Sequence, residues 1–278
     1  LRALFDLPAP AKLNLFLHVV GRRADGYHLL QSVFVLIDWA DTLHLERRDD
    51  GALHRHDLGP ALPADDLCLR AARALQQASG TPHGVDIHVH KRVPWGAGLG
   101  GGSSDAASTL LGLNRLWGLH WPRDRLAALA LKLGADVPFF VGGTNAFVEG
   151  IGERITALEL PPLWLAVVKP EAVLGTAAIF GSPDLLRNTP AVILADFLAD
   201  TQLSDNEAAG YGRNDLQPVA MGCCPQVGEV AEWLRARYGN SRMSGSGSAV
   251  FARAGTGDQP MATFTAADLP PGWVGRMC

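Results

Sequence analysis

The sequence contains few cysteines. Four of the 278 residues are cysteine, and no two of them form a C-x-x-C pair. A chain of this length with so few cysteines does not depend on a disulfide framework, and the spacing excludes the common zinc and dithiol motifs. We therefore expect the protein to work in a reducing compartment.

The sequence also lacks long apolar runs and an excess of positive charge. Its most apolar stretches, such as residues 163–168, have the length of a strand, whereas a membrane-spanning helix needs about 18 apolar residues. The 24 basic and 28 acidic residues give a formal net charge of −4, so no positive field attracts nucleic acid or anionic lipid. The N-terminal residues do not follow the pattern of a secretory signal. We expect neither nucleic acid nor a membrane as a partner.

The remaining composition is that of a globular protein of helices and strands. Apolar residues make up 47 % of the chain and charged residues 19 %, which is close to ordinary usage. The length is sufficient for two domains or one large one. A breaker, ELPP at residues 159–162, precedes a new apolar strand. We therefore predict an N-terminal domain of residues 1–158 and a C-terminal domain of residues 159–278.

Local patterns predict the order of the elements. Alternating residues or short apolar runs predict strands at residues 12–20, 29–39, 85–93 and 164–168. The first two flank a charged, glycine-containing turn and form a predicted β-hairpin. Alanine and leucine at helical spacing predict helices at residues 104–116, 123–133 and 227–237. Ser103 or Ser104 is expected to start the first helix, and Asp124 the second.

The glycine-rich segment PWGAGLGGGSSDAA, residues 94–107, gives the clearest indication of function in the sequence. A predicted strand precedes it and a predicted helix follows it. Glycines let backbone N–H groups approach a ligand closely, and the helix adds unpaired N–H groups and the positive end of its dipole. The ligand that suits this arrangement is a polyphosphate. The alternative is a flexible linker or a tight turn.

Two known phosphate-binding motifs do not describe this loop. No lysine follows its last glycine, so it is not a Walker A sequence. Gly96, Gly98 and Gly101 satisfy G-x-G-x-x-G, but a dinucleotide site also needs an acidic residue about 20 positions further on. Residues 119–121 are Leu, His and Trp. A nicotinamide oxidoreductase is therefore disfavoured.

The segment resembles the ATP-binding loop of the GHMP kinases. PAPAKLNLFL at residues 8–17 and RMSGSGSAVFA at residues 242–252 are similar to two further motifs of that superfamily, the second of which packs beside the nucleotide loop. The resemblance implies a two-domain α+β fold. Its N-terminal domain would be ribosomal-protein-S5-like with a mixed sheet, its C-terminal domain ferredoxin-like with an antiparallel sheet, and its active site would lie in the cleft between them. The ATP-binding residues it implies are Pro94, Trp95, Gly96, Ala97, Gly98, Leu99, Gly100, Gly101, Gly102, Ser103 and Ser104.

Longer segments of the sequence resemble one particular group of GHMP kinases. PAPAKLNLFLHVVGRRADGYHLLQSVF, GLGGGSSDAA and LGADVPFFVGG are similar to GHMP kinases of the non-mevalonate isoprenoid pathway. Their acceptor is the 2-hydroxyl of 4-diphosphocytidyl-2-C-methyl-D-erythritol. Mevalonate kinases lack GRRADGYH in this form. Magnesium is expected to arrive with the nucleotide, because Mg²⁺ keeps most of its water and needs few protein ligands, and Ser104 is the expected protein contact.

The transfer of a phosphoryl group to an alcohol needs a base and a positive charge. Asp136 is a polar residue among apolar neighbours in LGADVPFF. Taken alone, it would more often be a helix-end or turn residue, but the resemblance implies the general base. Lys12 is expected to lie next to Asp136, to keep it ionised and to polarise the hydroxyl and the γ-phosphate. Taken alone, Lys12 would be a solvated strand residue.

The resemblance also implies a cytidine pocket, formed by Asn14, Tyr27, His28, Thr176 and Phe180. A pyrimidine ring favours aromatic faces, so Tyr27 and Phe180 could sandwich it while His28 reads its polar edge. Without the resemblance, both aromatic rings would be assigned to the core. The segment NDLQP at residues 214–218 is expected to have a structural role.

Two other functions stay open at this stage. Another GHMP kinase, acting on homoserine or mevalonate, would not need the stacking pair Tyr27 and Phe180. A non-catalytic nucleotide-binding regulator would keep the glycine loop but would not need Asp136 and Lys12. The predicted partners are small molecules only, and the expected oligomeric state is a monomer or a homodimer. The pathway implies a bacterium or a plastid, and because no transit peptide is recognised we expect the bacterial cytoplasm.

Overall fold

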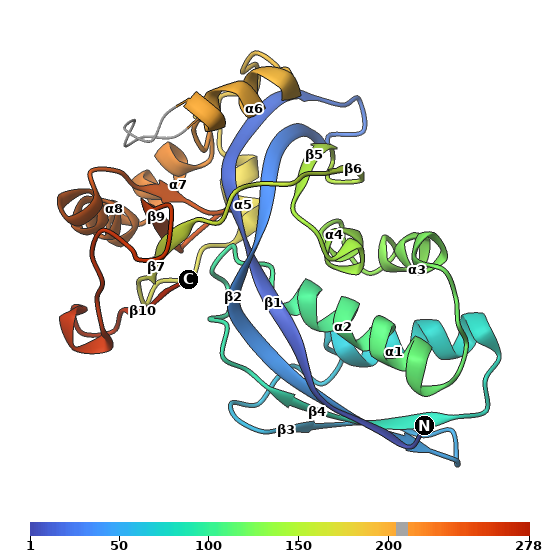
Figure 1. The fold of residues 1–278 in the computed structure, drawn as a ribbon. Helices are drawn as coiled ribbons and strands as arrows, with labels where there is room; N and C mark the ends of the chain where they lie inside the picture. Colours follow the sequence, from blue (N-terminus) through green and yellow to red (C-terminus); the bar gives the residue numbers. More distant parts are fainter. Residues whose placement is uncertain (204–210) are drawn as a thin grey trace. The chain divides into compact units, whose positions relative to one another are not determined.

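The computed structural model of the chain describes residues 1–203 and 211–278, which form two compact units (Figure 1). The first unit comprises Leu1–Ala11, Leu36–Val93 and Gly100–Thr144, and the second comprises Lys12–Val35, Pro94–Leu99 and Asn145–Cys278. Both units are discontinuous in sequence because β1 (Ala3–Arg22) and β2 (His28–Arg48) each pass through both. The division at residues 158 and 159 stays a prediction. The predicted hairpin is confirmed, since β1 pairs with β2.

The first unit contains a mixed sheet with helices on one face. The second half of β2 pairs antiparallel with β4 (Gly84–His90), and β4 pairs parallel with β3 (Leu53–Asp57). Figure 1 shows α1 (Leu67–Ser79) and α2 (Gly101–Leu116) lying along this sheet. Leu43, Leu45 and Ile87 are fully buried. Side chains alternate along a strand, so this apolar face of the sheet meets the helices.

Two shorter helices complete the first unit. They are α3 (Arg123–Ala130) and α4 (Val137–Gly142), and both pack against α2. The prediction that Ser103 or Ser104 starts the helix after the glycine loop is wrong, because α2 begins after Gly100, which adopts a φ of 70° and makes no side-chain cap. The prediction for Asp124 is also wrong, since Pro122 occupies the N-cap of α3. Pro122 has a φ of −66° and a ψ of 157°, the extended backbone that an N-cap residue adopts.

The second unit contains an antiparallel sheet with the order β10 (Val274–Met277), β7 (Trp164–Lys169), β9 (Val250–Gly255) and β8 (Arg242–Met243). Helix α8 (Pro225–Tyr238) packs on it, with α7 (Gln217–Cys223) beside α8. The first half of β2 pairs with β5 (Ala146–Gly150), which pairs with β6 (Arg154–Ala157). The remaining elements are α5 (Thr176–Gly181), α6 (Leu194–Leu203) and the 3₁₀ turn η1 (Ala266–Asp268).

The NDLQP segment connects separate parts of this unit by hydrogen bonds, which confirms its structural role. Asp215 accepts hydrogen bonds from the backbone of Val19 at 2.8 Å and from the Thr189 hydroxyl at 2.6 Å. Asn214 donates to the carbonyls of Met243 at 2.7 Å and Gly245 at 2.8 Å. Within residues 1–203 and 211–278, no helix combines the length and apolar character that crossing a membrane requires.

Candidate active site

The first part of the glycine loop, Pro94–Leu99, is held by residues 242–252, the C-terminal glycine motif. The backbone N–H of Ala249 donates to the Ala97 carbonyl at 3.0 Å. The hydroxyl of Ser244 donates to the Gly98 carbonyl at 3.1 Å. The predicted packing of residues 242–252 beside the nucleotide loop is therefore confirmed.

Glycine is required at position 98 for two reasons. Its φ is 74°, in the left-handed region that favours glycine. A Cβ atom at this position would also lie 2.2 Å from the Ser244 carbonyl oxygen. The close approach of two backbones, which the sequence predicted from the run of glycines, is present between these two segments.

The second part of the loop begins helix α2 in the first unit. Gly100 caps the helix without a side-chain hydrogen bond, so the first N–H groups of a 16-residue helix can turn toward an anion. Ser104 follows in the first turn and is 0 % exposed. Among the residues that the structure describes, none is a hydrogen-bond partner of its Oγ.

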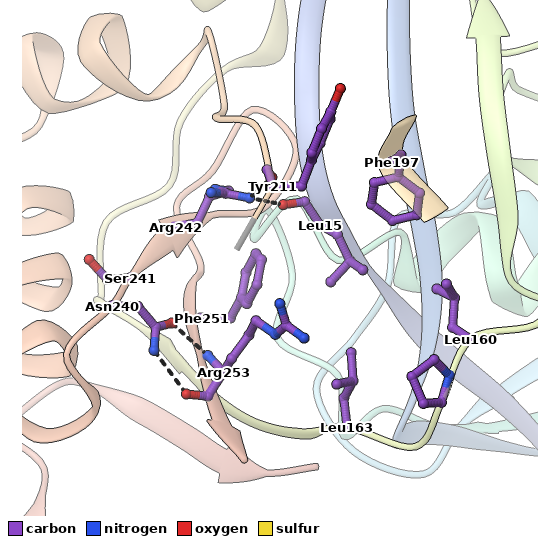
Figure 2. A pocket seen from close by; sticks show the side chains of 11 residues that line it. Leu15, Leu160, Leu163, Phe197, Tyr211, Asn240, Ser241, Arg242, Phe251 and Arg253 are labelled. Carbon is purple, nitrogen blue, oxygen red and sulfur yellow. Dashed lines mark hydrogen bonds between the residues drawn. The ribbon is translucent and has the colours of Figure 1, made fainter. Parts of the chain in front are cut away.

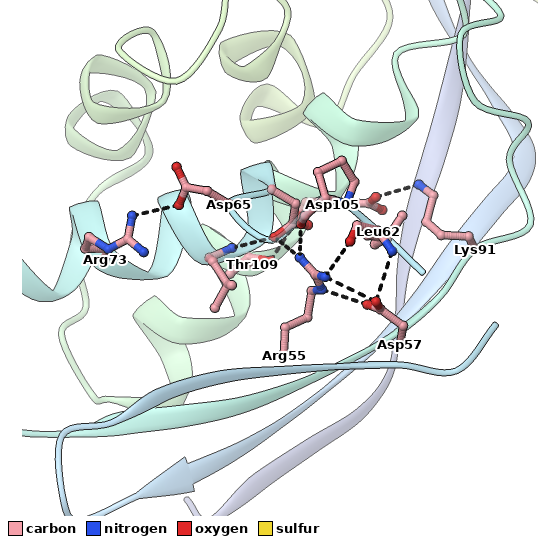
Figure 3. Close-up of polar contacts among 11 residues, drawn as sticks. Arg55, Asp57, Leu62, Asp65, Arg73, Lys91, Asp105 and Thr109 are labelled. Atoms are coloured by element: carbon pink, nitrogen blue, oxygen red, sulfur yellow. Dashed lines mark hydrogen bonds and ion pairs between the residues drawn. The ribbon is translucent and has the colours of Figure 1, made fainter. Parts of the chain in front are cut away.

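A buried ion-pair network borders this helix start, and the sequence did not predict it. Lys91 Nζ donates to Asp105 Oδ2 at 2.6 Å and also to Asp41 Oδ2; Figure 3 shows the contact between Lys91 and Asp105. Asp41 also accepts from the backbone N–H of Val93 at 2.8 Å. The network therefore joins β2, the residues that enter the glycine loop and the first turn of α2.

The carboxyl group of Asp105 has a perturbed pKa. Burial raises this pKa to about 7, Lys91 opposes the rise, and Asp41 adds to it. Asp105 is 3 % exposed, so water contributes little to stabilising its charge. The folded protein therefore favours the protonated form of the Asp105 carboxyl more than water does.

We expect Asp105→Asn to remove one pH dependence of stability. The folded-state pKa of about 7 lies above the ordinary value of 3.8, so the folded protein keeps a proton that the unfolded chain has released. The stabilisation by this proton is complete below about pH 4 and is lost as the pH rises through about 7. Relative to the variant, the free energy of unfolding of the wild type should fall by about 1.4 kcal/mol per pH unit in that window.

Urea unfolding of both proteins between about pH 4 and pH 8 measures this difference. A constant difference between wild type and variant over the whole range would show that Lys91 keeps Asp105 ionised.

Lys12 is buried in the second unit. It is 4 % exposed, its Nζ donates to Asn14 Oδ1 at 2.5 Å, and the ammonium lies 4.6 Å from the centre of the Phe34 ring. The alternative of a solvated strand lysine is therefore wrong. An ammonium removed from water interacts more strongly with a nearby phosphate than an exposed one does.

Asn14 holds this lysine from its own buried position. Its Nδ2 donates to Ser32 Oγ at 2.9 Å, and its backbone N–H donates to Ser244 Oγ at 3.1 Å. Asn14 is 1 % exposed, so in this structure its amide supports Lys12 rather than facing solvent. The direct contact between Asn14 and a substrate stays a prediction.

Asp136 lies in the first unit, directly before α4. It occupies the N-cap position, but its side chain makes no capping hydrogen bond. Val137, Phe139 and Phe140 are buried around it, whereas Asp136 itself is partly exposed. Asp136 therefore lies in a turn at the start of a helix, where the alternative for a lone aspartate places it, and its role as general base stays a prediction.

The predicted cytidine-binding residues lie in the second unit. The rings of His28 and Phe180 are 5.1 Å apart and tilted by 35°. Tyr27 is 60 % exposed, which leaves its ring available for stacking, but its pairing with Phe180 across a base stays a prediction. The Thr176 hydroxyl lies 2.8 Å from the Ser246 hydroxyl, which links α5 to the C-terminal glycine motif.

A separate pocket lies elsewhere in the second unit (Figure 2), and its space of about 520 Å³ includes open solvent. Arg242 stands at its edge and donates to the carbonyls of Tyr211 at 2.7 Å and Gly212 at 2.6 Å. Burial, with Arg253 nearby, lowers the pKa of Arg242 to about 10. None of the predicted site residues lines this cavity, so its size alone does not make it the active site.

Comparison with known proteins defines the class to which this fold and site belong. Residues 66–144 match the family model of the GHMP kinase N-terminal domain, and residues 196–260 match that of the GHMP kinase C-terminal domain. A homoserine kinase from Cytophaga hutchinsonii has the same fold, with a TM-score of 0.61 at 17 % identity over 92 % of this chain and 85 % of the other. The protein is a kinase of the GHMP class, and the predicted two-domain α+β fold is confirmed.

Relatives with higher sequence identity show which family within this class the chain belongs to. The 4-diphosphocytidyl-2-C-methyl-D-erythritol kinase of Methylibium petroleiphilum is 67 % identical over 100 % of this chain and 95 % of the relative. That of Variovorax paradoxus is 54 % identical over 100 % and 96 %. A crystal structure of 4-(cytidine 5'-diphospho)-2C-methyl-D-erythritol kinase has a TM-score of 0.76 and 38 % identity, over 91 % of this chain and 90 % of the other. The chain belongs to the 4-diphosphocytidyl-2-C-methyl-D-erythritol kinase family, whose members are ATP-dependent phosphotransferases.

Proposed function

We propose that this chain transfers the γ-phosphoryl group of ATP to the 2-hydroxyl of 4-diphosphocytidyl-2-C-methyl-D-erythritol in the non-mevalonate route to isoprenoid precursors. The products are the 2-phosphate and ADP. The observation that carries the proposal is the 67 % identity, over the full chain, to a relative that bears the name of this kinase. The buried Lys12 and the tightly held glycine loop support it, because phosphoryl transfer depends on positioning and on positive charge.

In the proposed mechanism, the carboxylate of Asp136 accepts the proton of the 2-hydroxyl as its oxygen attacks the γ-phosphorus. The bond between that phosphorus and the β,γ-bridging oxygen breaks, and ADP leaves with the electron pair. The ammonium of Lys12 stabilises the charge on the transferring group. The N–H groups of the glycine loop and of the first turn of α2 hold the phosphates that remain on ADP.

The residues present suit a magnesium ion bound to the nucleotide. Mg²⁺ prefers oxygen ligands, and the Ser104 Oγ is an oxygen donor without a hydrogen-bond partner among the described residues. We propose that Ser104 contacts the ion. When bound, Mg²⁺ neutralises charge on the β- and γ-phosphates.

Tyr27→Ala is expected to raise the Michaelis constant for the cytidine substrate by about 5-fold to 150-fold, since stacking on an aromatic ring is worth roughly 1 to 3 kcal/mol per base. The turnover number should change much less, because Tyr27 has no proposed part in the chemistry. Steady-state kinetics at saturating ATP measures both constants. An unchanged Michaelis constant would mean that Tyr27 does not contact the base.

The proposed function is tested by coupled measurement of ADP release from magnesium-ATP. The reaction is run with 4-diphosphocytidyl-2-C-methyl-D-erythritol, mevalonate and homoserine at matched concentrations. ADP release with the cytidine compound alone is expected. Release with mevalonate or homoserine instead would assign the chain to another GHMP activity, and ATP binding without release in all three reactions would indicate a regulator.

The setting of the reaction is part of the proposal. The named relatives come from bacteria, which supports a bacterial cytoplasm as the place of action. The proposed partners are the two small-molecule substrates, and the proposed oligomeric state is a monomer or a homodimer.

A further inference from the structure

Arg187, in the segment between α5 and α6, is held in one orientation by backbone carbonyls. Its Nη1 donates to the Leu185 carbonyl at 2.9 Å, and its Nη2 donates to the carbonyls of Phe180 at 3.1 Å and Ser182 at 2.6 Å. The guanidinium is planar, so these contacts also fix the direction of its remaining donors. One of those donors, Nε, points at His28.

The contact with His28 determines where the imidazole carries its proton. Arg187 Nε lies 3.0 Å from His28 Nε2. A guanidinium has donors and no acceptor, so Nε2 must accept and cannot carry hydrogen. The ring is then neutral and carries its hydrogen on Nδ1. Among the described residues, no protein group receives the hydrogen on Nδ1.

The surrounding charges favour the same state. Burial lowers the pKa of His28, and the positive charges of Arg187 and Arg22 lower it further. Protonation of Nε2 would place two positive donors against each other at hydrogen-bond distance. The imidazole therefore remains a neutral Nδ1–H donor to a lower pH than an ordinary histidine would, because its pKa is lowered.

Arg187 also connects His28 to the ring that is proposed to stack on the base. The carbonyl that it binds on α5 belongs to Phe180, and the Phe180 ring lies 5.1 Å from the His28 ring. One side chain thus holds the backbone of Phe180 and sets the hydrogen-bonding character of the neighbouring His28.

We propose that Arg187 is a positioning residue that determines base specificity: by holding His28 as an Nδ1–H donor, it makes the pocket accept cytosine and reject uracil. This inference rests on the proposed function, since it assumes that the pocket binds a pyrimidine nucleotide. Cytosine and uracil differ in the hydrogen-bonding groups on the edge of the pyrimidine ring. Cytosine presents acceptors at both O2 and N3, whereas uracil carries hydrogen on N3. Opposite a fixed donor, the N3–H of uracil would leave two donors facing each other.

The expected size of the discrimination follows from the cost of an unsatisfied polar pair. Leaving buried donors unpaired typically reduces affinity by about 5-fold to 150-fold. A site built to form a hydrogen bond therefore rejects the ligand that cannot form it more strongly than a merely apolar pocket would.

The tautomer can be measured directly on the wild-type protein. Long-range ¹H–¹⁵N correlation spectra of the imidazole, with His28 assigned by comparison with His28→Gln, should show hydrogen on Nδ1 and a bare Nε2. The ring should titrate below its ordinary pKa of 6.5. Hydrogen on Nε2 instead would overturn the proposal, whatever the enzymatic activity.

The selectivity is tested with Arg187→Met, using Arg123→Met as the matched control. Arg123 likewise donates to backbone carbonyls, those of Val141 and Gly142, but it belongs to the first unit and makes no contact with His28. Dissociation constants for CDP and UDP are measured by calorimetry. The ratio of the two should fall about 10-fold or more in Arg187→Met and stay unchanged in Arg123→Met.

A purely structural role for Arg187 would weaken CDP and UDP binding equally, and an unchanged ratio would therefore overturn the proposal. If Arg187→Met does not fold, the wild-type spectra still decide the tautomer. If the chain releases no ADP with the cytidine substrate, the proposed function fails, but the spectra and the CDP to UDP ratio still test the role of Arg187.

Discussion

Asp136→Asn is expected to lower the turnover number by about 10² to 10⁴-fold, the usual effect of removing a general base. An amide cannot accept the hydroxyl proton, while its size and shape match those of the carboxylate. ATP binding should persist, because the glycine loop and the start of α2 hold the nucleotide. The measurement is steady-state ADP release, with the dissociation constant of ATP determined separately by calorimetry.

The matched control for this variant is Asp124→Asn. Asp124 is an exposed aspartate in the first turn of α3, in the same unit as Asp136. Its replacement removes one negative charge from the same unit and should leave turnover within about 2-fold of the wild type. Near-normal turnover in Asp136→Asn would remove Asp136 from the role of base.

Lys12→Met is expected to lower the turnover number by about 10² to 10³-fold, similar to the loss of one preorganised donor at a site of developing charge. Methionine has a similar length and suits the buried site beside the Phe34 ring. The variant therefore removes the charge with little change in packing. The effect should appear in the turnover number more than in the Michaelis constant for ATP, because the charge acts on the transition state.

Lys169→Met provides the comparison for the loss of a buried ammonium. Lys169 is 6 % exposed and donates to the carbonyls of Pro170 at 2.7 Å and Ala172 at 3.1 Å. Both variants lose a buried lysine, so thermal unfolding should show destabilisation in each. A loss of turnover in Lys169→Met as large as that in Lys12→Met would indicate that general destabilisation, rather than the charge at residue 12, causes the effect.

The sequence predicted the strands well and their lengths less well. The predicted strand at residues 12–20 is observed as β1, Ala3–Arg22. The observed strand includes Pro8 and Pro10, although proline cannot donate to a ladder. Among the described strands β1 pairs only with β2, apart from an isolated bridge between Leu17 and Asn214, and a strand with a mostly open side can leave that side without donors.

The part of the site that is continuous in sequence was also predictable. The run of glycines between a strand and a helix predicted that another backbone segment approaches closely. The structure shows this close approach at Gly98. The segment that approaches Gly98 contains Ser244, which is 146 residues away in the sequence. Its position could therefore be inferred only from the resemblance.

The side-chain networks could not be predicted for a similar reason. Lys91 and Asp41 are 50 residues apart, and Arg187 and His28 are 159 apart. Charged residues are usually exposed, so the sequence pattern gives no reason to place any of these four near another. Only the folded chain shows which charges share a buried site.

The hydrogen bonds from Ser244 and Ala249 to the glycine loop also bear on synthesis of the chain. A ribosome that has released the first 240 residues has already made the whole glycine-rich segment. The residues that fix the carbonyls of Ala97 and Gly98 have not yet emerged. Nascent chains that end before them contain the loop sequence but not the contacts that set its shape, so the nucleotide site matures only after residues 244–249 have emerged from the ribosome.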